Sequence, residues 1–156
     1  MKIAALMPAA ALLFAAALNA EVTTNVKVPI TLPAYIPCAN GGTGEIVLLG
    51  GDLHILFTTT VSPSGRLTLT SQFQPQGVSG KGMSTGDKYQ GTGVTRTSLD
   101  VDTVDGFPYV FTYVNNFRII GQGPGNNSTV HMTIHTTINA DGTVTATVDN
   151  TKVECK

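Results

Sequence analysis

The stretch DLHILFTTTVSPSGRLTLTSQFQ, residues 52–74, decides the fold class, because two alternating runs flank a turn signal. Leu53 and Ile55 share one side of the first run, whereas His54 lies on the other side. A period of two residues is the pattern of a half-buried β-strand. The turn SPSG at 62–65 therefore predicts a hairpin of two neighbouring antiparallel strands.

The same pattern continues along the chain, in the runs EIVLL, DKYQGTGVTRT, FPYVFTYVNNFRII, STVHMTIHTTI and TVTATVDNTKVEC. Further turn signals stand at GQGPGNN, 121–127, and at NADG, 139–142. Apolar spacing follows a helical period nowhere after the N-terminal segment. We therefore expect an all-β, up-and-down meander of seven or eight antiparallel strands, and we favour a closed, calycin-like barrel over a sandwich.

The N-terminal segment, residues 1–20, has the composition of a signal peptide. MKIAALMPAAALLFAAALNA begins with one positive charge, continues as an apolar run too short for a permanent membrane span, and ends in small residues. We expect a secreted or periplasmic protein. Residues 21–37, which contain three prolines, form an extended arm that either crosses a barrel end or pairs at an edge. Residues 38–156 then form a single β-barrel domain.

The two cysteines, Cys38 and Cys155, bracket most of the predicted domain. Export to an oxidising compartment favours a disulfide between them, because no other motif claims either thiol. Such a bond would hold the last strand against the start of the folded region.

The charge composition excludes several classes of partner. The net charge is −1, only 12% of residues are charged, and no basic cluster occurs, so we expect no nucleic acid partner. The glycine-rich runs GVSGKGMSTG and GQGPG are followed by strand-like sequence, whereas a phosphate cradle needs a helix there. We interpret the first run as a mobile loop at one barrel end and the second as a hairpin, and we expect no cofactor.

The run FPYVFTYVNNFRII carries bulky side chains on both of its faces. A contiguous apolar surface of this kind usually marks an interface. Its cover would be either the proline-containing arm or a second copy of the protein, which leaves a homodimer open.

The histidines of TVHMTIHTTI, residues 129–138, are the first candidates for a site. His131 and His135 alternate with aliphatic residues, so both face away from the predicted core. Positions separated by four residues on a strand lie roughly 13 Å apart, too far for two ligands of one metal ion. We favour solvated wall residues, with a polar groove that includes His54 as the alternative and no metal site.

The acidic stretch SLDVDTVDG invites comparison with a calcium loop, because it brings Asp100, Asp102 and Asp105 close together. An EF-hand loop that began at Asp100 would need an oxygen ligand at Val104 and a glutamate at Phe111. A solvated acidic turn is therefore the favoured interpretation.

Three segments, FQPQGVSGKG, TGDKYQGTGVT and NNFRIIGQGPGNN, resemble parts of short exported bacterial proteins of unassigned activity. The resemblance covers residues 38–155. It implies a bacterial cell-envelope or extracellular location, and it supplies no catalytic residues.

The functional expectation is a non-enzymatic protein that binds a small or apolar ligand. Nucleophile elbows and zinc-protease motifs are absent from the sequence, and an eight-stranded barrel can hold one small ligand. The candidate ligand-binding residues are the aromatics Phe57, Phe73, Tyr109, Phe111, Tyr113 and Phe117. The same aromatics could instead fill a solid core.

Two alternatives belong to other classes of protein. The first is a barrel enzyme of the allene oxide cyclase or dirigent type, which acts on an apolar intermediate. It would need convergent polar groups, for which the candidates are Tyr89, Tyr113, Asn115 and Arg118. The second is a structural or adhesive surface module that works through its exposed threonine face.

Overall fold

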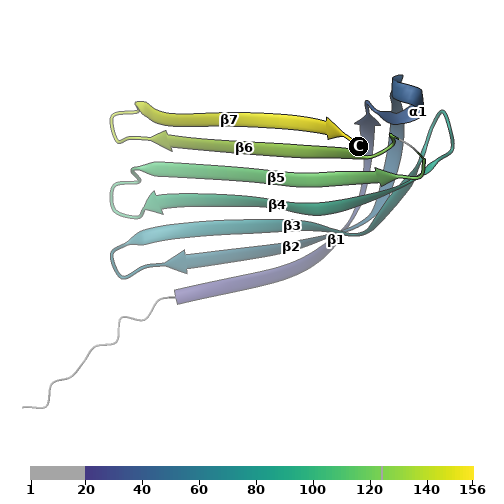
Figure 1. Ribbon diagram of the computed structural model, residues 1–156. Helices are drawn as coiled ribbons and strands as arrows, with labels where there is room; N and C mark the ends of the chain where they lie inside the picture. Colours follow the sequence, from purple (N-terminus) through teal and green to yellow (C-terminus); the bar gives the residue numbers. More distant parts are fainter. Residues whose placement is uncertain (1–19, 124) are drawn as a thin grey trace, which may run out of the picture.

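The computed structural model describes residues 20–123 and 125–156, and its strands form one antiparallel sheet. The elements are β1 (Ala20–Ile36), α1 (Ala39–Gly42), β2 (Glu45–Val61), β3 (Arg66–Gly82), β4 (Lys88–Asp102), β5 (Tyr109–Gly121), β6 (Ser128–Ile138) and β7 (Val144–Cys155). The seven strands lie side by side in sequence order (Figure 1). The predicted all-β, up-and-down meander is therefore confirmed. The predicted signal peptide falls outside the described residues, except for Ala20 at the start of β1.

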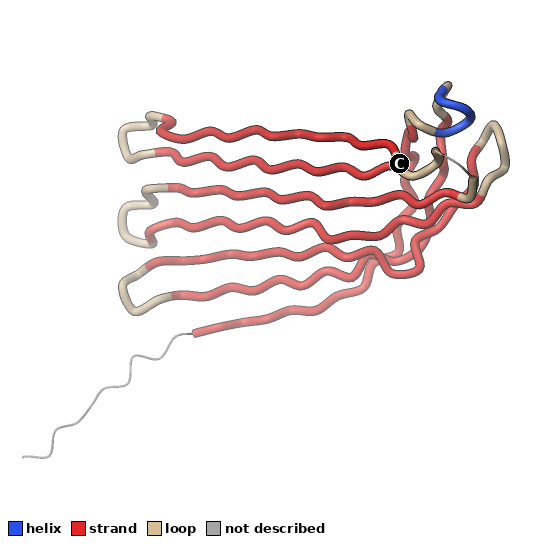
Figure 2. Tube along the Cα trace, in the orientation of Figure 1, coloured by secondary structure: helices blue, strands red, loops and turns tan. Residues whose placement is uncertain are grey.

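The closed barrel favoured from the sequence is not confirmed, because the sheet is open. Within the described residues β1 pairs only with β2 and β7 only with β6, so both are edge strands. The strands do not divide into two packed sheets either. Figure 2 shows a broad layer that curls at the end carrying α1, whereas the opposite end, with three hairpin turns, stays open.

Residues 21–37, expected as an arm, are almost entirely part of the sheet. β1 pairs with β2 over its whole length, from Ala20 opposite Val61 to Ile36 opposite Glu45. Of the two placements left open by the sequence, the structure has edge pairing. Pro29 and Pro33 have no backbone N–H to donate to a neighbouring strand. An edge strand tolerates them, because one of its sides has no neighbour, whereas a central strand pairs on both sides.

The only compact core among the described residues lies inside the curled end. Its members are Ile36, Ala39, Val47, Leu49, Val78, Tyr89 and Ile119. Small residues allow the strands to curl tightly here. A Cβ on Gly91 would lie 3.0 Å from Val78 and 3.2 Å from Phe117, and one on Gly121 would collide with the ring of Tyr89. At the open end, the strand positions on the same face carry Leu, Phe and Tyr instead of glycine, and no curl forms there.

An irregularity in the pairing of β2 with β3 marks the beginning of the curl. The register shifts between Gly50 and Asp52, opposite residues 76–79 of β3. The glycine-rich run expected to be a mobile loop is divided differently in the structure. Gly80 and Gly82 are paired within β3, and only the residues after Gly82 form the turn to β4.

The predicted disulfide joins the two edges of the sheet at the curled end. Cys38 follows β1 and Cys155 ends β7, and their Cα atoms lie 5.6 Å apart. This bond connects strands that share no backbone pairing among the described residues. The ring around the curled end is therefore completed covalently rather than by hydrogen bonds.

Candidate ligand-binding groove

The strand register sorts the side chains of the sheet onto two faces. One carries mostly apolar residues and is called the apolar face, and the other is called the polar face. Residues paired across antiparallel strands project on the same side, so the registers of all seven strands can be followed across the sheet. The inward side of the curl continues as the apolar face, because buried Val47 and Leu49 alternate with exposed Ile46 and Leu48. Among the described strand residues, the only charged side chains on this face are Glu45 and Asp149.

The aromatic residues proposed as ligand contacts all project from the apolar face. Phe57 and Phe73 come from β2 and β3, and their rings meet edge to face with centroids 6.3 Å apart. The other four, Tyr109, Phe111, Tyr113 and Phe117, occupy alternate positions of β5. The sequence thus predicted a shared face correctly, although that face borders an open sheet rather than a barrel interior.

A groove of about 360 Å³ crosses the apolar face where the sheet begins to curl. Its walls come from five strands and are almost entirely apolar: Ile30, Leu32, Leu53, Phe73, Pro75, Val78, Thr95, Tyr113 and Phe117. Ile30, Leu32 and Phe117 also pack against the buried core, which fixes this wall of the groove.

Half of the proposed aromatic contacts therefore lie in the groove. Phe73, Tyr113 and Phe117 line it, whereas Phe57, Tyr109 and Phe111 lie outside it on the same face. Sequence reasoning missed Ile30 and Leu32, because it treated β1 as a separate arm. It missed Val78 because that residue stands within a glycine-rich run. The alternation of Ile30 and Leu32 with Thr31 was the available signal.

A buried carboxylate stabilises the curled end beside the groove. Glu45 is 3% exposed and accepts hydrogen bonds from the Tyr89 hydroxyl at 2.6 Å and the Thr85 hydroxyl at 2.9 Å. It also accepts the backbone N–H groups of Ser84 and Thr85. Burial raises the pKa of Glu45, but these hydrogen bonds outweigh it, so the pKa lies below its ordinary value. Burial and the charge of Glu45 raise the pKa of Tyr89.

The three histidines all project from the polar face and do not form one groove. His54 lies on β2, and the other two lie on β6, four strands away, which is roughly 19 Å. His54 lies 2.6 Å from Asn25, and His135 lies 2.9 Å from the Thr112 hydroxyl. His131 is exposed and opposite Lys152. In the described part of the chain no group of three potential ligands could hold a metal ion.

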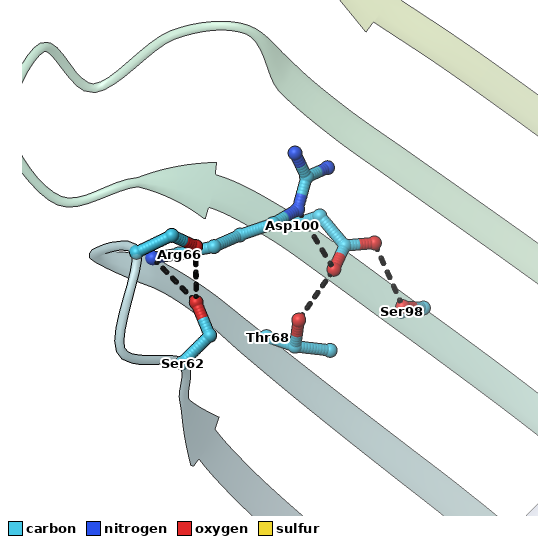
Figure 3. Close-up of polar contacts among 6 residues, drawn as sticks. Ser62, Arg66, Thr68, Ser98 and Asp100 are labelled. Atoms are coloured by element: carbon cyan, nitrogen blue, oxygen red, sulfur yellow. Dashed lines mark hydrogen bonds and ion pairs between the residues drawn. The ribbon is translucent and has the colours of Figure 1, made fainter. Parts of the chain in front are cut away.

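The acidic turn between β4 and β5 is held by its own polar groups. Asp100 accepts the Thr68 hydroxyl at 2.5 Å and lies 3.8 Å from Arg66, a contact between β3 and β4 that Figure 3 shows. Asp102 accepts the backbone N–H groups of Val104 and Asp105. These carboxylates therefore stabilise a strand pair and a turn.

The polar groups that a barrel enzyme would need are not brought together. Tyr113 and Asn115 project from the apolar face, whereas Arg118 is exposed on the polar face. The Tyr89 hydroxyl donates to Glu45 at the curled end. A set of acid, base and electrophile around one point of the groove is therefore absent among these candidates.

Comparison of the chain with family models, with curated proteins and with solved structures finds no match.

Proposed function

We propose that this protein is an exported, non-enzymatic binding protein that takes up a small apolar ligand in the groove of its apolar face. The groove itself carries the proposal. Its volume of about 360 Å³ lies in the range of small-molecule sites, which are mostly apolar and bear few polar groups. The Cys38–Cys155 disulfide is consistent with export to an oxidising compartment.

The chemistry of the groove walls supports an apolar ligand with at most one or two polar atoms. The polar groups that line the groove are the hydroxyls of Thr95 and Tyr113. Thr95 already donates to the side-chain oxygen of Asn115 at 3.1 Å. The Tyr113 hydroxyl, the other polar group of the groove wall, can bind a single polar atom of the ligand.

A neutral fluorescent probe, N-phenyl-1-naphthylamine, tests the proposal directly. Wild-type protein should bind it with a rise in fluorescence, because the probe leaves water for an apolar wall. Thr95→Phe fills the groove and should weaken binding about tenfold or more, which corresponds to about 1.4 kcal/mol. Thr133→Phe makes the same change on the polar face and serves as the control.

The proposal requires a difference between these two variants. Equal affinities of wild type, Thr95→Phe and Thr133→Phe would show that the probe binds elsewhere. Absence of probe binding by wild type, together with absence of added mass in native mass spectrometry of protein purified from its own host, would refute a ligand carrier.

A further inference from the structure

The open half of the apolar face, between the groove and the hairpin turns at 62–65, 103–108 and 139–143, has no cover among the described residues. We call this surface the flat half. Figure 1 shows the strands of the flat half as a single layer, with α1 and the curl confined to the other end. Leu69, Leu99 and Phe111 form a row across its three central strands, each opposite the next.

Large apolar side chains of the flat half are exposed to solvent. Phe57 is 41% exposed, Val61 39% and Val22 63%. Between the groove and the turns the seven strands contribute about seven residues each, which gives the flat half an area of roughly 700 Å². Soluble monomers rarely expose contiguous apolar surface beyond a few hundred Å², and larger patches mark interaction sites.

The flat half is also nearly free of charge. Among its described residues, only Asp149 is charged, and it lies on the edge strand β7, opposite Ile134. The polar face behind it carries ion pairs instead, such as Lys27 with Asp52 at 2.9 Å. Two flat halves can therefore meet without burial of opposed like charges, whereas two polar faces cannot.

We propose that two copies of this chain pack their flat halves against each other, as the two layers of a sandwich. Roughly 700 Å² on each copy, or about 1,400 Å² in total, lies within the range of about 1,200 to 2,000 Å² that stable interfaces bury. Sheets pack face to face about 10 Å apart, and a broad sheet is best covered by another broad sheet. A ligand that fits the groove is too small to cover such an area. The pairing is independent of the proposed function, because the groove lies beside the curl.

Sedimentation equilibrium of the mature, disulfide-bonded protein at micromolar concentration tests the pairing. Wild type should have twice the mass of one chain. Leu69→Lys places an ammonium at the centre of the flat half and should raise the dissociation constant more than about thirtyfold. Thr70→Lys, at the next residue on the polar face, should leave the dimer intact. Circular dichroism checks that both variants keep the sheet.

A second measurement does not depend on any variant. If folding and pairing are coupled, the urea midpoint of wild type should rise with protein concentration. A monomer at micromolar concentration with a concentration-independent midpoint would overturn the proposal. A monomer that carries bound lipid in native mass spectrometry would overturn it too, and would identify lipid as the cover. If Leu69→Lys is monomeric but still binds the probe, the groove binds its ligand independently of pairing. The two proposals can therefore fail separately.

Discussion

At the scale of single residues, Glu45 makes stability depend on pH. Its pKa lies below the ordinary value, because the hydrogen bonds from Tyr89, Thr85 and Ser84 outweigh burial. The unfolded chain therefore binds the proton more readily than the folded chain. The contribution of Glu45 to stability is complete above its ordinary pKa, near 4.3, and is lost as pH falls through the lower folded value.

Glu45→Gln should lower the free energy of unfolding at pH 7 by about 1 to 3 kcal/mol, because buried donors lose a charged acceptor. The difference from wild type should begin to narrow as pH falls below the ordinary value, near 4.3, because the unfolded carboxyl takes up its proton first, and should narrow further as pH passes the lower pKa of the folded carboxyl. Urea unfolding at a series of pH values measures both effects. Glu21→Gln, an exposed position on β1, is the control and should change neither. A constant difference down to pH 2 would contradict this role of Glu45.

The orientation of single residues was predictable where alternation is regular. The sequence placed Leu53 and Ile55 on one side and the three histidines on the other, and the register agrees. The Glu45 and Tyr89 pair was not predictable. Its residues stand 44 positions apart and meet only because the sheet curls over Gly82 and Gly121. The alternation of apolar and polar residues predicts on which face of the sheet a side chain lies. It does not predict which distant side chain it contacts when the sheet curls.

At the scale of elements, the irregularity between β2 and β3 depends on Gly51. Its φ of 154° is a conformation that residues with a side chain rarely adopt, and a Cβ would lie 2.7 Å from the Cα of Val78. Gly50, its neighbour, has ordinary space, with the nearest atom 3.9 Å away. The two glycines therefore form a matched pair within one strand.

Gly51→Ala should destabilise the protein by at least about 2 kcal/mol, because both backbone strain and a backbone clash oppose it. Gly50→Ala should change stability by less than about 1 kcal/mol in either direction. Denaturant unfolding of the two variants gives the comparison. Equal free energies of unfolding for both would show that the irregularity adapts freely and does not fix the beginning of the curl.

EIVLL and DLHILFTTTV, separate runs in the sequence, form one strand, β2, and the expected arm forms β1, so strand number was not predictable. Strand order and the turns at 62–65, 121–127 and 139–142 were predictable, because each of these hairpins has a local signal. Strand length was not. Glycines at 50, 51, 80 and 82 indicated loops in the sequence, but cross-strand pairing continues through them and gives β2 and β3 17 residues each. Glycine removes a side chain without removing backbone hydrogen bonds, so a neighbouring strand decides whether the strand continues.

At the scale of the whole molecule, the sequence could not decide between a closed and an open sheet. Closure requires that the first and last strands pair, and this depends on curvature summed over every strand. The curl brings the ends of β1 and β7 together only where Cys38 and Cys155 lie. At the other end, bulky residues such as Phe57, Leu69 and Phe111 occupy the apolar face, and no curl forms.

The disulfide should therefore hold both the fold and the groove. Its cysteines are 117 residues apart in sequence, and closure of such a loop stabilises by up to about 4.7 kcal/mol in the chain-entropy model. The double variant Cys38→Ser with Cys155→Ser should lose several kcal/mol of unfolding free energy, as denaturant titration would show. It should also bind N-phenyl-1-naphthylamine more weakly, because β1 carries Ile30 and Leu32 and is no longer tied to β7. Unchanged probe affinity in a folded double variant would mean that packing of Ile36, Val47 and Leu49 alone maintains the curl, and that the covalent bond stabilises only against unfolding.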